Sequence, residues 1–151
     1  MKKFELTAES KINIFGKKLF RIKALISFGD VEEGETGGWI EKEENLEQSS
    51  GDAWVYGDAE VSGNARVYGN AEVYGNADYT TIHGFGTQFR TTTFFQCEDK
   101  QIRVSCGCFL GTIPEFREQV KNTREGKIAE EYLMIADLME KHFVKEKESG
   151  E

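Results

Sequence analysis

A six-residue repeat in the middle of the chain constrains its fold more than any other feature. Residues 55–78 read VYGDAE VSGNAR VYGNAE VYGNAD, so Val, Gly and Ala each recur at every sixth position over four hexads, with one Ser in place of Tyr. A period of six fits neither an α-helix nor the simple alternation of a hairpin. It fits a short extended piece followed by a sharp corner, because Gly and the following Asn or Asp readily adopt a positive φ.

This hexapeptide resembles the repeat of left-handed β-helix proteins, in which about three hexads form one triangular coil. The resemblance predicts that Val55 lies one coil away from Val73 in the interior, and that Tyr56 lies under Tyr74 on the surface. Residues 37–46 could add degenerate coils. A stub of about two or three coils leaves apolar ends open, so the flanking segments must cap it.

Before the repeat, the sequence predicts a hairpin. Ile12 and Ile14 alternate with polar residues, and a Gly16–Lys17 turn leads into an apolar-rich segment at residues 19–25. Such alternation around a Gly-containing turn is typical of two antiparallel strands. We expect the lysines of this hairpin to line its solvent face.

After the repeat, the sequence predicts an α+β module. Residues 91–97 and 102–106 are rich in β-branched and aromatic residues, and a polar turn separates them. Thr112 and Glu115 form a capping box that starts a helix, and a second helix carries an apolar stripe along residues 128–143.

We therefore expect a mainly β fold. It is a short left-handed parallel β-helix with an N-terminal hairpin cap and a C-terminal module of one hairpin and two helices. The expected boundaries are residues 1–78 for the hairpin and β-helix, 79–146 for the capping and binding module, and 147–151 for a polar tail.

Two stretches outside the hexads resemble a family of hexapeptide-repeat proteins found in phages, prophages and bacteria. GGWIEKEENL at residues 37–46 is similar to their N-terminal half, and CGCFLGT at residues 106–112 is similar to their C-terminal module. Members are labelled polymer-forming or transferase-like. The resemblance covers residues 4–143 and implies a left-handed β-helix in a phage or bacterial setting. Residues 86–90 read GTQFR, where relatives tend to carry a Gly-Ser-Arg-type segment.

Charge is unevenly distributed along this acidic chain, whose net charge is −8. Residues 1–23 carry seven Lys or Arg and two Glu, whereas residues 30–60 carry eleven Asp or Glu and one Lys. An acidic chain gains little from counterion release, so we expect no direct binding to nucleic acid. The acidic stretch is either a solvated face or a surface that meets a basic partner.

The sequence also favours a cytoplasmic location, or the host cytoplasm if the protein is phage-encoded. No apolar run approaches the ~18 residues that span a bilayer, so we expect no membrane partner. The N-terminus lacks the apolar core and cleavage site of a secretory signal. Three cysteines are an odd number, for which reduced thiols are the default interpretation.

Acyl transfer is one candidate chemistry, because hexapeptide acyltransferases use a His as general base beside a groove that holds acyl-CoA. His83, just past the repeat, is the candidate catalytic residue, and a surface or capping His is the alternative interpretation. Metal binding is a second candidate. Cys97, Cys106 and Cys108, with His83 or His142, could form a tetrahedral zinc site. Reduced cysteines that pack as small apolar residues are the alternative.

An anion or nucleotide pocket is a third candidate. The Gly-rich segment at residues 84–90 combines free backbone N–H groups with a hydroxyl, an amide and a guanidinium, all of which suit a phosphate. Phe85 or Phe89 could stack on a base. A structural connector is the alternative interpretation. The candidate ligand-binding residues are Gly86, Thr87, Gln88, Arg90 and Arg103.

A partner surface is the fourth candidate, built from acidic residues and outward-facing aromatic side chains of the β-helix. Its predicted residues are Glu41, Glu43, Glu44, Glu47, Trp54, Tyr56 and Tyr74.

No pattern of nucleophile and base, paired carboxylates or phosphate loop stands out, so we expect a non-enzymatic binding protein without a cofactor. It would counter host defence by binding a host protein or by sequestering a nucleotide-like signal, an inference from association rather than from a site. A hexapeptide-type acyltransferase using acyl-CoA and a structural self-associating protein are the alternatives. A homo-oligomer is expected in each case.

Overall fold

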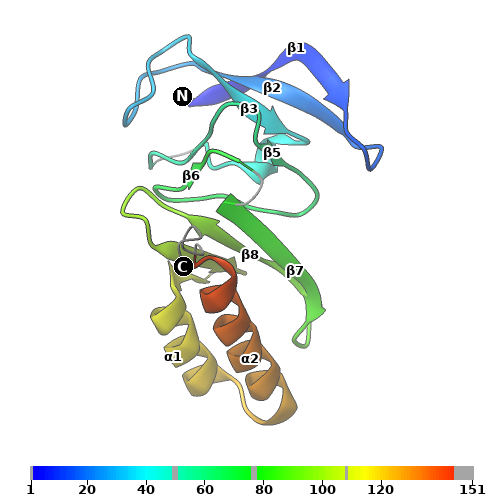
Figure 1. Cartoon of the computed structure of the whole chain (residues 1–151), viewed down its shortest axis with the longest axis vertical. Helices are drawn as coiled ribbons and strands as arrows, with labels where there is room; N and C mark the ends of the chain where they lie inside the picture. Colours follow the sequence, from blue (N-terminus) through cyan, green and yellow to red (C-terminus); the bar gives the residue numbers. More distant parts are fainter. Residues whose placement is uncertain (1, 49–50, 76–77, 108, 145–151) are drawn as a thin grey trace, which may run out of the picture.

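Most of the secondary-structure elements in the described residues are β-strands, and two helices follow them (Figure 1). The computed structural model describes residues 2–48, 51–75, 78–107 and 109–144. Within these residues, no helix has both the length and the apolar character needed to cross a membrane. In chain order the elements are β1 (Phe4–Ile12), β2 (Lys18–Ala24), β3 (Thr36–Ile40), η1 (Glu43–Asn45), β4 (Trp54–Val55), β5 (Glu60–Val61), β6 (Glu72–Val73), β7 (Tyr79–Phe85), β8 (Arg90–Gln96), β9 (Ile102–Cys106), β10 (Phe109–Thr112), α1 (Ile113–Thr123) and α2 (Gly126–His142).

The described strands form one mixed sheet, one antiparallel sheet and one parallel pair. The first sheet has the order β1-β2-β3-β5, in which β1–β2 and β2–β3 are antiparallel and β3–β5 is parallel. The second sheet has the order β10-β9-β8-β7 and is antiparallel throughout. β4 and β6 form the parallel pair. The β1–β2 pairing confirms the predicted N-terminal hairpin.

The predicted fold class, a short left-handed parallel β-helix, is wrong. Most strand pairs are antiparallel, and parallel pairing is limited to β3–β5, β4–β6 and a single bridge between Leu46 and Val67. The physical reason lies in segment length. Corners such as Gly57, Gly63 and Gly69, all at positive φ, restrict strands in the hexads to two residues. The longer β-forming flanks pair through tight turns instead, because local antiparallel pairing has a low loop-closure cost.

The predicted spacing within the hexads is nevertheless confirmed. Val55 lies opposite Val73 in the β4–β6 register, and both side chains are fully buried. The rings of Tyr56 and Tyr74 stack with centroids 4.4 Å apart and an interplanar angle of 20°. The described valines and alanines of the hexads therefore share one apolar core, which also contains Trp54.

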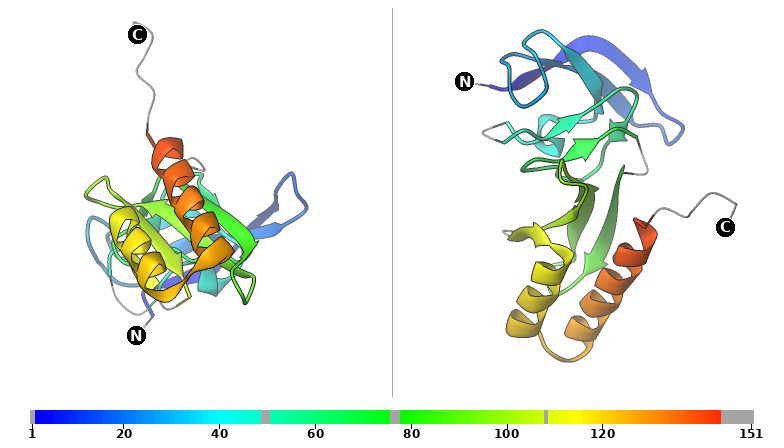
Figure 2. Two further views of the ribbon diagram at one scale, coloured as in Figure 1. Left: turned by 90° about the horizontal axis from the view of Figure 1, so that it is seen from below. Right: turned by 60° about the vertical axis from the view of Figure 1, so that its left-hand side comes forward.

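The C-terminal module contains the predicted helices and more strands than the sequence indicated. β8 and β9 form the predicted hairpin, while β7 and β10 extend it to four strands. Thr112 accepts a hydrogen bond from the Glu115 N–H and the Glu115 carboxylate accepts one from the Thr112 N–H, which confirms the capping box. α1 and α2 lie side by side (Figure 2).

The two faces of the second sheet serve different cores, because side chains alternate along each strand. Phe94 and Val104 pack with the helices, whereas Phe95 packs with the hexad core. The division at residue 78 into two units stays a prediction. The predicted tail at residues 147–151 lies outside the described residues.

Close backbone approach between β3 and the hexads gives a stability prediction. A Cβ on Gly38 would lie 2.7 Å from the Ala59 carbonyl oxygen and 2.7 Å from a Val55 methyl group. We expect Gly38→Ala to lower the free energy of unfolding by about 1–3 kcal/mol, because the added methyl group overpacks a full core. Gly75→Ala is the control, since a Cβ there meets open space. Urea unfolding should separate the two variants, and equal stability would contradict this packing.

Candidate functional site

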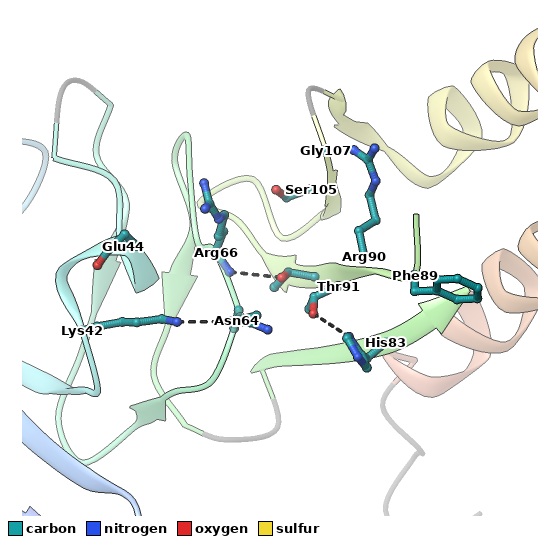
Figure 3. A pocket seen from close by; sticks show the side chains of 12 residues that line it. Lys42, Glu44, Asn64, Arg66, His83, Phe89, Arg90, Thr91, Ser105 and Gly107 are labelled. Carbon is teal, nitrogen blue, oxygen red and sulfur yellow. Dashed lines mark hydrogen bonds between the residues drawn. The ribbon is translucent and has the colours of Figure 1, made fainter. Parts of the chain in front are cut away.

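A cleft of about 470 Å³ separates the hexads and the segment around η1 from one end of the second sheet (Figure 3). Its volume lies in the range of small-molecule sites. The described residues that line it are Lys42, Glu44, Asn64, Ala65, Arg66, His83, Phe89, Arg90, Thr91, Thr93, Ser105 and Gly107.

A buried asparagine shapes one wall of this cleft. Asn45 is fully buried, and its Oδ1 accepts hydrogen bonds from the N–H groups of Glu41 (3.1 Å) and Lys42 (2.9 Å). Its Nδ2 donates to the carbonyl oxygens of Gly63 (3.1 Å) and Ala65 (2.9 Å). A buried amide that is satisfied on both sides fixes the backbone it contacts. Asn45 thereby holds the backbone of Lys42 beside the corner that precedes Arg66.

The opposite wall is the face of the second sheet that points away from the helices. Thr91, Thr93 and Ser105 alternate with helix-facing residues and lie on this face, as the β8–β9 register requires. The Thr93 Oγ1 accepts a hydrogen bond from the Arg66 N–H at 3.1 Å, which ties the two walls together. His83 Nδ1 lies 3.1 Å from Thr91 Oγ1.

Arg90 lies at the edge of the cleft with its guanidinium against Gly107 (Figure 3). Gly107 has a φ of +60°, and a Cβ at this position would overlap the guanidinium. Arg90 Nη2 also donates to Gln88 Oε1 at 2.6 Å. Two features therefore favour glycine at position 107: its positive φ and the arginine side chain that packs against it.

The cleft gathers three basic side chains that lack ion-pair partners among the described residues. Within the described part of the chain, Lys42, Arg66 and Arg90 form no ion pair, although Arg103 pairs with Asp99 at 2.8 Å. Their side chains donate to neutral oxygens of Asn64, Tyr68 and Gln88. Of the described lining residues, Glu44 is the one carboxylate. Cations, an imidazole and hydroxyl groups together suit an anion with several oxygen atoms.

The predicted ligand-binding residues are only partly brought together. Arg90 lines the cleft, but Gly86, Thr87 and Gln88 form the turn between β7 and β8 and are not among its lining residues. Gly86 packs under the Tyr132 hydroxyl, where a Cβ would lie 2.6 Å from the oxygen. The Asp99 carboxylate raises the pKa of Arg103 by hydrogen bonding, so this guanidinium is already engaged, and Arg103 is not among the described cleft-lining residues.

The predicted partner surface contains one error and two residues with internal roles. Trp54 is fully buried and packs edge-on against Phe28. Its placement on the surface was wrong because the six-residue spacing does not determine how β4 is covered. The carboxylates of Glu41 and Glu47 accept hydrogen bonds from the N–H groups of Gly63 (2.7 Å) and Gly69 (2.8 Å), so they hold the hexad corners.

The remaining residues of that surface are accessible but lie apart in the chain. Tyr74 is half-exposed and stacks on Tyr56, with Lys100 Nζ 5.9 Å from the Tyr74 ring centroid. Glu43 pairs with Lys2 at 3.1 Å, and Glu44 lines the cleft described above. These side chains belong to different segments, and neither Tyr56 nor Tyr74 lines the cleft that contains Glu44.

The predicted grouping of Cys97 and Cys106 is also wrong. Cys97 is buried in the hexad core, whereas Cys106 pairs across the strands with Thr92 and packs on the helix-facing side. A two-residue alternation therefore places the thiols on opposite faces. Cys108 lies outside the described residues. Among the described residues, no group of three or more His, Cys, Asp or Glu side chains is arranged to hold a metal ion.

Burial of Cys97 makes stability depend on pH. Burial raises the pKa of this thiol from 9.0 to about 12, so the unfolded chain ionises first. The contribution of the neutral thiol to the free energy of unfolding is complete below pH 9 and is lost as the pH rises toward 12. The loss between pH 9 and pH 10 is about 1 kcal/mol. Urea unfolding at pH 8 and pH 10 should show a smaller stability gap between wild type and Cys97→Ala at pH 10. An equal gap at both pH values would contradict burial of the thiol.

His83 lacks the surroundings of an acyltransferase base. Its side chain is exposed, and among the described residues its ring contacts the Thr91 hydroxyl rather than a carboxylate that would orient it. Its place in the cleft suits hydrogen bonding to an anion.

Sequence reasoning missed most of the cleft, including Lys42, Arg66 and Ser105. One signal was present. The charged sixth position of the hexads is occupied by Glu60, Glu72 and Asp78 in three cases and by Arg66 in the fourth. A single cation in an acidic series marks a position with a separate role.

Comparisons with known proteins add no assignment. Neither a scan against models of protein families nor a search of curated proteins gave a match for this chain. The resemblance to phage and bacterial hexapeptide-repeat proteins therefore stays a prediction that rests on its motifs.

Proposed function

We propose that this protein is a non-enzymatic binding protein for a small phosphate-bearing ligand, held in the cleft between the hexads and the second sheet. The observation that carries the proposal is the convergence of Lys42, Arg66 and Arg90 on one cleft without carboxylate partners among the described residues. Other basic side chains in the described part of this acidic chain do reach a carboxylate, as Lys11 does with Glu60 and Arg117 with Asp137.

The chemistry of the lining matches a phosphate more closely than a carboxylate. Guanidinium groups bind phosphate through paired N–H donors, and hydroxyl groups on a strand face supply further donors. Thr91 and Ser105 stand on the sheet wall, while Arg66 approaches from the hexads. Cations on both walls favour a ligand with two or more anionic groups, such as a diphosphate.

Sequestration of a nucleotide-like ligand in this cleft has more support than protein binding through the surface that the sequence predicts. Trp54, a predicted residue of that surface, is buried in the core. Two glutamates of the same surface, Glu41 and Glu47, accept hydrogen bonds from the backbone at the hexad corners. As part of the proposal, the protein acts in the cytoplasm, where phosphorylated metabolites and reduced thiols occur together.

Isothermal titration calorimetry with pyrophosphate, adenosine diphosphate and adenosine tests the proposal. We expect both phosphates to bind and adenosine alone to give no heat. Affinity should fall as salt increases, because charge–charge attraction is screened. Absence of binding by either phosphate at millimolar concentration and low salt would overturn the proposal.

A further inference from the structure

Apolar side chains gather at an exposed projection of the first sheet. Ile12, Ile14 and Phe15 at the tip of the β1–β2 hairpin are 69%, 93% and 79% exposed. The hairpin extends beyond the body of the protein in the views of Figure 1 and Figure 2. Three large apolar residues this close together in contact with water mark an interaction site.

The tip is held in a defined shape. Asn13 Oδ1 accepts hydrogen bonds from the N–H groups of Phe15 (2.9 Å) and Lys17 (3.0 Å). The Asn13 N–H donates to the Lys17 carbonyl oxygen at 2.9 Å, and Gly16 turns the chain at a φ of +80°. An ordered tip loses little conformational entropy on binding, which favours a contact made by the tip itself.

Lysines lie beside this apolar tip, and acidic residues are missing from its segment. No Asp or Glu occurs between residues 10 and 29. Lys18 lies opposite Ile12 in the β1–β2 register and forms no ion pair within the described part of the chain. Lys17 is half-exposed and lies 4.0 Å from Glu41, and an exposed pair at this distance contributes little free energy. The two ammonium groups therefore attract an anionic partner.

The charge distribution along the chain gives that partner a preferred approach. A protein of net charge −8 is repelled from an anionic surface, so contact depends on the part that it presents. Residues 1–23 carry seven Lys or Arg and two Glu, and the hairpin tip belongs to this basic segment. Lys11 is already paired with Glu60 at 2.9 Å, so Lys17 and Lys18 supply the charge of the tip.

The shape of the tip suits a fluid bilayer surface. A convex apolar projection needs a preformed hollow in a protein partner, whereas lipids rearrange around it. Phe15 follows Ile12 by three residues, so at ~3.4 Å per residue the apolar tip is at most about 10 Å deep. Interfacial segments bury their apolar side ~5–10 Å into the boundary between head groups and acyl chains. The depth of the tip therefore matches this boundary.

We propose that the hairpin tip docks on the surface of an anionic lipid bilayer. Ile14 and Phe15 insert between the lipids, and the ammonium groups of Lys17 and Lys18 remain at the level of the phosphates. The expectation of no membrane partner rested on the absence of a spanning segment, which a peripheral contact does not need. The inner leaflet of a cell membrane is anionic, so this contact is compatible with a cytoplasmic protein. It is independent of any ligand in the cleft.

Co-sedimentation with vesicles tests this docking. We expect wild type to bind vesicles of phosphatidylglycerol, and to bind less as phosphatidylcholine replaces that lipid and as salt increases. The tip variant, Ile14→Ser with Phe15→Ser, should bind at least about tenfold more weakly, because the inserted apolar surface is lost. Lack of binding by wild type to pure phosphatidylglycerol at low salt, or equal binding by the tip variant, would overturn the proposal.

Two matched variants show whether binding belongs to the tip. Met134→Ser with Leu138→Ser removes two exposed apolar residues of α2 and should bind like wild type. Arg66→Ala with Arg90→Ala removes cations of the cleft and should also bind like wild type. Loss of binding in the second variant would assign the lipid phosphates to the cleft and contradict docking by the tip. Circular dichroism should show native folds for all variants, since the substituted apolar side chains are exposed.

Insertion itself is measured with a fluorescent tip. In Phe15→Trp, the new indole should be quenched by vesicles whose acyl chains carry bromine, whereas Trp39 and Trp54 are 6% and 0% exposed and give the wild-type background. Quenching no greater than in wild type would refute insertion. Self-association of wild type that the tip variant loses, without vesicle binding, would also overturn the proposal and assign the tip to a protein contact.

Discussion

Replacing Arg66 and Arg90 together by alanine should abolish pyrophosphate binding and leave the protein folded. A charge-assisted hydrogen bond contributes about 1.5–3 kcal/mol, so each single variant should weaken binding by roughly 10- to 100-fold. Neither side chain forms an ion pair within the described residues, and their bonds to Tyr68 and Gln88 are neutral. Stability should therefore change little. Calorimetric titration of both single variants and the double variant measures the effect.

Arg124→Ala is the matched control for this series. Arg124 is an exposed arginine at the end of α1, and its guanidinium donates to the Thr123 carbonyl oxygen. Its removal changes the net charge as each single variant does, but Arg124 is not among the described residues that line the cleft. An equal loss of affinity in Arg124→Ala would show that binding follows overall charge. Full affinity in the double variant would exclude the cleft.

Replacing Trp54 by alanine should have the largest effect on stability, a decrease of about 3–5 kcal/mol in the free energy of unfolding. Trp54 is fully buried, with its ring centroid 5.3 Å from that of Phe28 and 6.3 Å from that of Phe4. Truncation would leave a cavity where the hexad core meets the N-terminal sheet. Urea unfolding followed by circular dichroism measures the change.

Tyr74→Ala is the comparison, because Tyr74 is 51% exposed. Its stacking on Tyr56 contributes about 0.5–1.5 kcal/mol, so this variant should remain clearly more stable than Trp54→Ala. The reverse order would place Trp54 on the surface and Tyr74 in the core.

The sequence predicted local structure better than the global arrangement of strands. The hexad period fixed which residues share a side, so Val55 and Val73 meet as expected. The period did not determine the length of each strand or which strands pair in the segments before and after the hexads. Thr93 and Phe94 belong to a long segment that pairs with its neighbours through tight turns, and this antiparallel sheet dominates the architecture.

The cleft was harder to predict because its cations come from separate segments. Arg90 was identified from the polar loop around it. Lys42 and Arg66 lie at the cleft because Asn45 hydrogen-bonds the backbone of Lys42 and of Ala65, the residue before Arg66. That asparagine looked like an ordinary polar residue in an acidic stretch. Its importance follows from complete burial and from bonds to residues some twenty positions away, which local patterns do not reveal.

The most direct test of the account is a pyrophosphate titration of isotopically labelled protein followed by NMR. We predict saturable shifts concentrated at the backbone amides of Arg66, Thr91, Thr93 and Ser105 and at the Arg90 guanidinium. Shifts that miss these groups, or that grow without saturation at lysines over the whole surface, would contradict a phosphate site in the cleft.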